Sequence, residues 1–270
     1  MTLSFRTLSN TLLLLSALCT LPSLTEAANA KRGIAFALDL TEAGDASKAS
    51  GTQISWEYDW QLNAPPNFPA GIEHVPMQHD RNGIDGFEAA VKGMGAKVAL
   101  GFNEPDVAAQ SNIPAGEAAD LWKQGIQPLA AAGVRLGSPA VSSSPAPAGT
   151  QWLKDFIAAC SGCTIDFIAV HWYGDGADNF ISYIQQVHTD FPNKPIWITE
   201  FASTSTDTAA FLQAVQAFLD QTVNWLDGQD FVERYSWFAF SRRAPPGSNL
   251  VSNLLDNGGN VNALGNAYLS

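Results

Sequence analysis

The chain has 270 residues, of which 46% are hydrophobic and 10% aromatic, with eight Trp. This length suits one large α/β barrel, which needs about 250 residues, better than two small domains. The net charge of −12 at pH 7 argues against nucleic acids and anionic membranes as partners, because both bind basic patches.

The first residues have the pattern of a secretory signal peptide. Arg6 supplies a basic start, the apolar run Leu12–Leu21 ends at Pro22, and small alanines follow before residue 31. A membrane anchor is the alternative, but a run of ten residues cannot span about 30 Å of hydrocarbon as a helix. We therefore expect residues 1–28 to be removed on secretion and residues 31–270 to form the functional domain.

Eight short apolar segments rich in β-formers alternate with helical patterns along the rest of the chain. Their continuous hydrophobicity, in place of strict alternation, is typical of parallel strands that are covered on both sides. The predicted strands are Gly33–Ala37, Ile54–Tyr58, His74–Met77, Lys97–Gly101, Arg135–Gly137, Asp166–His171, Pro195–Thr199 and Arg234–Phe238.

Amphipathic helices are predicted between these strands. Pro128 should kink or end the second of them. The clear ones are Ile84–Met94, Gly116–Ala132, Gln151–Cys160, Asp178–Thr189 and Thr208–Leu226.

The alternation of strands and helices predicts an α/β fold, a single (β/α)8 TIM barrel. The alternative, a doubly wound open sheet, needs a Gly-rich turn after the first strand, and Leu38–Thr41 offers none. After the last strand, Leu254–Val261 predicts a short C-terminal hairpin with an Asn-Gly turn. A short helix is then expected to end near Tyr268.

Two cysteines remain once the signal peptide is removed. In an oxidising compartment, Cys160 and Cys163 predict a small disulfide loop that closes the end of a helix. A redox-active pair is the alternative, but nothing nearby resembles a thioredoxin motif. Two cysteines make a poor zinc site, the four His show no metal-ligand spacing, and no phosphate or dinucleotide motif is present. We therefore expect no metal and no cofactor.

Two strands each deliver a glutamate to the carboxyl end of the predicted barrel, where active sites of this fold lie. They are Glu104 in the run ALGFNEP (residues 99–105) and Glu200 in IWITEF (residues 196–201). Cleavage of a glycosidic bond needs one protonated carboxyl group for the leaving group and one ionised carboxylate that attacks the anomeric carbon. Strands four and seven lie across a barrel, so the pair fits this chemistry. The alternative is that each glutamate is a solvated loop residue.

The sequence around both glutamates resembles a known family. Asn103-Glu104-Pro105 resembles the Asn-Glu-Pro motif of the clan A glycoside hydrolases, in which the Glu is the acid/base and the Asn binds the sugar 2-hydroxyl. Together with AVHWY (residues 169–173) and ITEFA (residues 198–202), the run LGFNEPD (residues 100–106) resembles glycoside hydrolase family 128. The similarity extends from residue 32 to residue 268.

This resemblance implies a retaining mechanism on β-1,3-glucan, with Glu104 as general acid/base and Glu200 as nucleophile. The carboxyl groups of a retaining pair lie about 5–5.5 Å apart. His171 and Tyr173 end the sixth strand, and one of them, with Tyr173 favoured, should hydrogen-bond Glu200 and keep it ionised. The alternative for His171 is a satisfied core histidine.

Aromatic residues are the predicted sugar contacts. Trp237 would form a floor at the cleavage site, and Trp56, Tyr58 and Trp60 would present faces to further glucose units, with Trp172 also expected at the substrate. The alternative is that these aromatic side chains belong to the core.

Two segments depart from the family pattern. Strand two carries acids at Glu57 and Asp59, and Gln78-His79 follows strand three, in the region that should line the sugar-binding cleft. These differences leave the choice between endo and exo action open. We expect a secreted, monomeric, endo-acting β-1,3-glucanase. The alternatives are a secreted β-glucan-binding protein without turnover and a hydrolase of a different wall polysaccharide.

Overall fold

The computed structural model describes residues 1, 28–204, 211–246, 248 and 250–270. Within these residues, no helix has both the length and the apolar character needed to cross a membrane. Almost all of the predicted signal peptide lies outside the described residues, so its presence stays a prediction.

Eight parallel strands form the centre of the fold. They are β1 Arg32–Phe36, β2 Trp56–Tyr58, β3 Glu73–His74, β4 Val98–Ala99, β5 Arg135–Leu136, β6 Ile168–Gly174, β7 Ile196–Ser203 and β8 Val232–Phe240.

The strands follow one another around a ring. Six form one sheet in the order β3-β2-β1-β8-β7-β6, and β4 pairs with β5. Single parallel bridges, Met77 to Leu100 and Gly137 to Phe167, join β3 to β4 and β5 to β6 just beyond the strand ends. This is the strand order of the predicted (β/α)8 fold.

Four of the strands are shorter than the sequence pattern predicts. β2 has three residues, and β3, β4 and β5 each have two. Pro76 and Pro139 follow β3 and β5, and proline lacks the N–H that a ladder needs. The ring is therefore held by single bridges on this side and by continuous ladders on the other.

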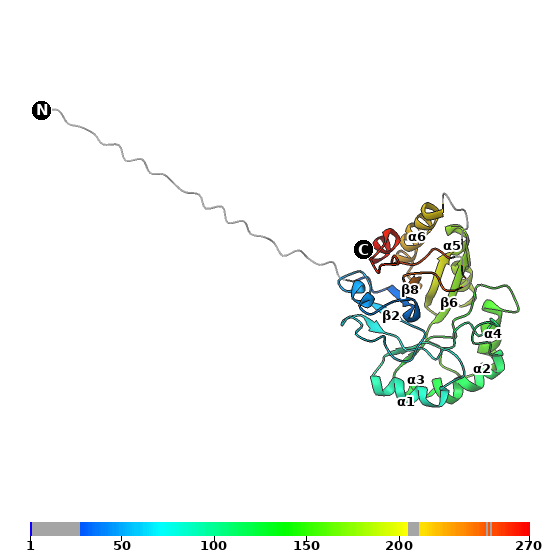
Figure 1. Ribbon diagram of the computed structural model, residues 1–270. Helices are drawn as coiled ribbons and strands as arrows, with labels where there is room; N and C mark the ends of the chain where they lie inside the picture. Colours follow the sequence, from blue (N-terminus) through cyan, green and yellow to red (C-terminus); the bar gives the residue numbers. More distant parts are fainter. Residues whose placement is uncertain (2–27, 205–210, 247, 249) are drawn as a thin grey trace.

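The α-helices pack outside the strands, with α1–α3 on one side and α5 and α6 on the opposite side (Figure 1). They are α1 Ile84–Met94, α2 Ala115–Leu121, α3 Pro128–Ala131, α4 Gly149–Ala159, α5 Ala177–Asp190, α6 Phe211–Asp227 and α7 Ala263–Leu269.

The predicted second helix is interrupted. A π-helical turn, Trp122–Ile126, separates α2 from α3, which begins at Pro128 as the proline predicts. A Cβ on Gly125 in this turn would lie 2.4 Å from the carbonyl oxygen of Ile84. The glycine therefore allows the close approach of α1.

The connections around β2 carry no α-helix among the described residues. Two 3-10 segments, Leu38–Leu40 and Asp45–Ala49, connect β1 to β2. Residues 59–72 form a loop between β2 and β3. The irregular chain on this side leaves room at the carboxyl ends of the strands.

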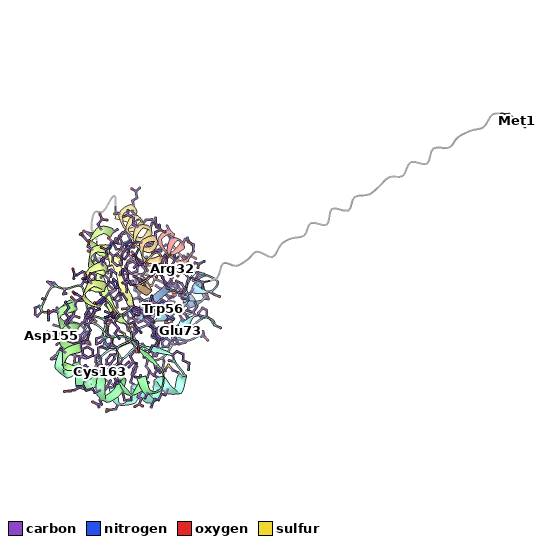
Figure 2. All side chains as sticks on the ribbon, turned by 180° about the vertical axis from the view of Figure 1, so that it is seen from behind. Met1, Arg32, Trp56, Glu73, Asp155 and Cys163 are labelled. Atoms are coloured by element: carbon purple, nitrogen blue, oxygen red, sulfur yellow. A yellow bond between two sulfur atoms is a disulfide. The ribbon has the colours of Figure 1, made fainter. Side chains whose placement is uncertain are left out.

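Large aromatic side chains fill the interior of the ring. The rings of Trp56 and Trp197 lie 5.2 Å apart, and Phe167 stacks on Trp197 at 4.0 Å. Trp56 is fully buried, and Figure 2 labels it near Glu73, its partner in the neighbouring strand. Gly33 is required here, because a Cβ at this position would lie 2.1 Å from the Trp56 ring.

Two local predictions are confirmed. Cys160 and Cys163 form a disulfide at the end of α4. The C-terminal hairpin joins Leu255 to Val261 by an antiparallel bridge. Its turn is closed by a hydrogen bond of 2.9 Å from the Gly259 N–H to the Asp256 carbonyl, with Asn257 and Gly258 between them.

Candidate active site

A cavity of about 990 Å³ lies at the carboxyl ends of the strands. Its walls come from residues 37–40 after β1, residues 59–61 after β2 and, after β8, Arg243, Pro245, Pro246, Ser248 and Leu250. Both Glu104 and Glu200 line it, as predicted.

A β-bulge directs Glu200 into the cavity. Val170 of β6 is opposite Ile198 of β7, whereas His171 is opposite Glu200, so Thr199 is an extra residue in β7. Side chains of a regular strand alternate, and a bulge resets that alternation. Glu200 therefore faces inward with Trp197, while Phe201 packs outward among the helices.

Glu104 lies in a loop held by its backbone. Its N–H donates to the Ala140 carbonyl at 2.8 Å, and its φ of 40° falls in the left-handed region that a glutamate seldom adopts. Asp106 fixes the same loop, because its carboxylate accepts the N–H groups of Ser142 at 3.1 Å and Gly149 at 2.9 Å.

The two candidate carboxylates lie close together around His171. One oxygen of Glu104, one oxygen of Glu200 and one nitrogen of His171 all lie within 4.8 Å of one another. His171 Nδ1 is 2.9 Å from Glu104 Oε1 and 3.4 Å from Glu200 Oε2. An ionised carboxylate only accepts, so when both glutamates are ionised Nδ1 carries the proton and faces both of them.

Glu200 accepts hydrogen bonds at both oxygens. Trp60 donates to Oε1 at 2.8 Å, and the Tyr173 hydroxyl donates to Oε2. The Tyr58 hydroxyl shares its one proton between Oε1 at 3.2 Å and the Thr199 carbonyl at 3.0 Å. The prediction that Tyr173 bonds Glu200 is confirmed. Three donors aimed at one carboxyl group favour its ionised form.

Burial acts against that ionised form. It raises the pKa of Glu200, and the neighbouring Glu104 adds to the rise. His171 and the hydrogen bonds from Tyr173 and Trp60 act in the opposite direction. Burial also opposes the charged form of His171, yet the two glutamates raise its pKa overall. The donors around Glu200 therefore offset the cost of keeping a carboxylate in a buried place.

Asn103 lies at the cavity beside Glu104, as predicted. Its N–H donates to the His79 carbonyl at 2.8 Å, and its carbonyl accepts the Ser111 hydroxyl at 2.6 Å. The side chain is 4% exposed, and Oδ1 has no hydrogen-bond partner among the described residues. The amide is thus held in place by its backbone.

Three predicted sugar contacts are wrong. Trp56, Trp172 and Trp237 are buried and do not line the cavity. The Trp56 indole donates to the Lys31 carbonyl near the amino end of β1.

Strand alternation explains the other two tryptophans. Trp172 lies between the inward-facing His171 and Tyr173, so it points outward and stacks on Phe218 of α6. Trp237 packs on the same phenylalanine, and its indole donates to the Ser252 carbonyl.

Phe238 takes the place at the cavity that was predicted for Trp237. It lines the cavity, with its ring 5.4 Å from Tyr173 and 5.9 Å from Trp60. Trp60 also lines the cavity, whereas Tyr58 lies behind it and contacts Glu200 through its hydroxyl. Phe238 follows Trp237 directly, and adjacent side chains of a strand face opposite sides, so Phe238 faces the cavity and Trp237 faces the helices.

Two groups of the described residues hold three metal-ligand side chains within 4.8 Å: Glu104, His171 and Glu200, and Glu57, Asp59 and His74. In the first group, Glu200 already accepts three donors from Tyr and Trp side chains. This is an arrangement suited to a carboxylate that acts as an acid, base or nucleophile.

Comparison with known proteins agrees with this geometry. The sequence profile described as "Glycosyl hydrolase catalytic core" matches residues 33–268. Alkali-sensitive linkage protein 1 of Schizosaccharomyces pombe is 37% identical over 245 residues, which cover 89% of this chain. The chain spans 44% of the length of that relative.

Solved structures of glycoside hydrolase family 128 superpose on most of the chain. A curdlan-specific exo-β-1,3-glucanase from Blastomyces gilchristii, in complex with glucose, is 34% identical, with a TM-score of 0.75 over 89% of this chain and 97% of that one. An endo-β-1,3-glucanase from Sorangium cellulosum is 31% identical, with a TM-score of 0.75 over 89% and 98%.

A third solved relative contains a bound oligosaccharide. It is an endo-β-1,3-glucanase from Amycolatopsis mediterranei in complex with laminaritriose, 33% identical, with a TM-score of 0.71 over 89% and 98% of the two chains. The chain described here therefore belongs to the glycosyl hydrolase catalytic core family and, within it, to glycoside hydrolase family 128.

Proposed function

We propose that the protein is a secreted, retaining, endo-acting β-1,3-glucanase. The observation that carries this proposal is the pair of carboxylates at one cavity, with an oxygen of Glu104 within 4.8 Å of an oxygen of Glu200. An inverting pair needs about 6.5–9.5 Å between its carboxyl groups to admit a water. The short separation supports double displacement.

The contacts of each glutamate support its role. Glu200, which accepts the Tyr58, Trp60 and Tyr173 donors, attacks the anomeric carbon. Glu104 gives its proton to the glycosidic oxygen as that bond breaks. Glu104 then takes a proton from water, which attacks the anomeric carbon and releases Glu200. Two inversions leave the configuration of the sugar unchanged.

The substrate class rests on the solved relatives. The relatives above are described as β-1,3-glucanases, and two of them contain glucose or laminaritriose. An aromatic wall of Trp60, Tyr173 and Phe238 supports sugar binding at the cavity. Both endo and exo enzymes occur among these relatives, so analysis of the products is needed to distinguish the two modes of action.

The first experiment measures reducing-sugar release from a linear β-1,3-glucan. The wild type should cut, Glu200→Gln should not, and Glu88→Gln on the exposed face of α1 should behave as the wild type. Matching thermal unfolding curves would show that all three are folded. A folded wild type that binds glucan and releases no sugar would replace this proposal with a glucan-binding protein.

Two further measurements test the finer parts of the proposal. NMR of the first product should show the β-anomer, whereas an α-anomer would contradict retention. An endo-acting enzyme should release mixed oligosaccharides as the early products from long glucan. Release of glucose alone would mean exo action.

Secretion and quaternary structure are tested on the expressed full chain. N-terminal sequencing of the secreted protein should show the loss of residues 1–28. Gel filtration should give a monomer.

The alternative substrate, a different wall polysaccharide, has one observation in its favour. Asp59 and His79, which depart from the family pattern, both line the cavity. A panel of wall polysaccharides tests it, and faster release from any other member than from β-1,3-glucan would support it.

A further inference from the structure

Three titratable side chains gather beside the catalytic cavity, and the mechanism above does not use them. Glu57 of β2 is opposite His74 of β3 in the parallel register, and Asp59 follows two residues after Glu57. One potential ligand atom from each lies within 4.8 Å of the others. Glu57 is fully buried, and Asp59 is 3% exposed. We call these three residues the buried charge cluster.

His74 is the cation of this cluster. Its Nδ1 lies 2.6 Å from Glu57 Oε1, and its Nε2 lies 3.1 Å from the Leu62 carbonyl oxygen. Both partners are acceptors. Burial raises the pKa of Glu57. A neutral imidazole donates from one nitrogen only, so opposite an ionised Glu57 the two contacts together make His74 an imidazolium. Burial opposes this charge, yet hydrogen bonding to Glu57 raises the pKa of His74 overall.

Among the described residues, His74 is the cation that forms an ion pair with these acids, through Glu57. The loop over the cluster, residues 61–72, contains no Asp, Glu, Lys, Arg or His. Glu73, the next residue before His74, pairs with Arg234 of β8. Glu57 Oε2 and Asp59 Oδ2 are buried and have no partner among the described residues. Such groups are costly, so the cluster depends on the imidazolium.

The cluster is joined to the catalytic site through Trp60. Asp59 Oδ1 accepts the Gln61 N–H at 3.1 Å, which closes a turn around Trp60. Trp60 has a φ of 60°, a left-handed conformation that is strained for a tryptophan. This turn directs the Trp60 indole to within 2.8 Å of Glu200 Oε1.

We propose that Glu57, Asp59 and His74 are positioning residues, which together hold the turn that aims the Trp60 indole at Glu200. The inference rests on the proposed role of Glu200 as nucleophile. Because Tyr58 and Trp60 belong to the same short segment and both donate to Glu200 Oε1, a shift of this segment removes hydrogen bonds from the nucleophile without touching it directly.

His74→Gln tests the cation. It removes the charge and leaves Glu57 and Asp59 uncompensated. We expect kcat on β-1,3-glucan to fall about tenfold or more, with KM within about twofold. Glu57→Gln with His74→Gln removes both charges and should recover most of that loss. His188→Gln, which changes a partly buried histidine of α5, is the matched control and should keep wild-type values.

The pH profile separates this role from simple packing. The imidazolium is present below the raised pKa of His74 and lost above it. With a dinitrophenyl β-laminarioside, whose leaving group needs no proton, wild-type kcat should fall at alkaline pH as His74 deprotonates. His171, whose pKa the two glutamates also raise, is present in both proteins, so the double variant should lack the part of this fall that comes from His74. The same fall in the double variant, or wild-type kcat in His74→Gln, would overturn the proposal.

A second pair of variants covers the case in which His74→Gln does not fold. Asp59→Asn keeps an acceptor for the Gln61 N–H, whereas Asp59→Ala opens the turn. Both remove the carboxylate from the cavity, so their comparison isolates the turn, and kcat of Asp59→Ala should lie about tenfold or more below that of Asp59→Asn. Equal kcat for the two would contradict the positioning role. If the wild type is active and Glu200→Gln is inactive in the same assays, the proposed function holds even where the positioning role fails.

Discussion

Tyr173→Phe is the sharpest single change at the nucleophile. It deletes the hydroxyl that donates to Glu200 Oε2 and keeps the ring that contacts Phe238 edge-on at 5.4 Å. A hydrogen bond to a charged group contributes about 1.5–3 kcal/mol. If that stabilisation is lost from the carboxylate at the moment of attack, kcat/KM should fall about 10- to 150-fold.

The same substitution should also shift the pH dependence of kcat/KM, in a direction that follows from the pKa of Glu200. Glu200 must be ionised to attack, and burial raises its pKa while the Tyr173 donor opposes the rise. Without that donor the pKa rises further, so the acid limb of kcat/KM should move to higher pH. The decrease in kcat/KM caused by Tyr173→Phe should therefore be larger at acid pH than near neutrality.

The assay is kcat/KM on a laminari-oligosaccharide across the acid range, with thermal unfolding of each variant. Tyr183→Phe is the matched control, because its hydroxyl lies 3.5 Å from the neutral Ser142 carbonyl and does not face the cavity. The reasoning fails if folded Tyr173→Phe keeps the wild-type acid limb, or if Tyr183→Phe shifts it equally.

Three other substitutions test separate features. Phe238→Ala removes an aromatic wall of the cavity and should raise KM severalfold, measured on a laminari-oligosaccharide; an unchanged KM would contradict its contact with sugar. Asp106→Ala frees two N–H groups of the loop 142–149. It should lower kcat and speed proteolysis of that loop, whereas cleavage at the wild-type rate would contradict this role. Gly33→Ala places a Cβ 2.1 Å from the Trp56 ring and should destabilise by about 1–3 kcal/mol, read as a Tm several degrees lower; an unchanged Tm would mean that the ring moves freely.

The sequence predicts the parts of the fold that depend on local pattern. Ile84–Met94 is a helix with the predicted bounds because its apolar spacing, Ile84, Phe87 and Val91, fixes one buried face. The apolar run before Glu200 predicts β7, although the strand continues past the predicted end at Thr199 to Ser203 and stays buried. Both predicted glutamates accordingly lie at the cavity.

The choice of aromatic contacts fails for a physical reason. Along a strand, adjacent residues face opposite sides, so Trp237 and Phe238, or Trp172 and Tyr173, differ only in the phase of the alternation. That phase depends on the bulges in β7 and β8, which shift the register by one residue. Trp56 is misassigned for another reason, since its depth along β2 depends on the barrel packing around Trp197.

The same alternation places the unusual residues of strands two and three in two different environments. Glu57 and Gln78 are buried away from the cavity; Glu57 pairs with His74, and the Gln78 amide donates to the carbonyls of Asp80 and Asn82. Asp59 and His79 line the cavity. Since a bound sugar contacts only what lines its cavity, any difference in substrate preference from the related glucanases should depend on Asp59 and His79. Glu57 and Gln78 should instead affect stability and the position of the groups around Glu200.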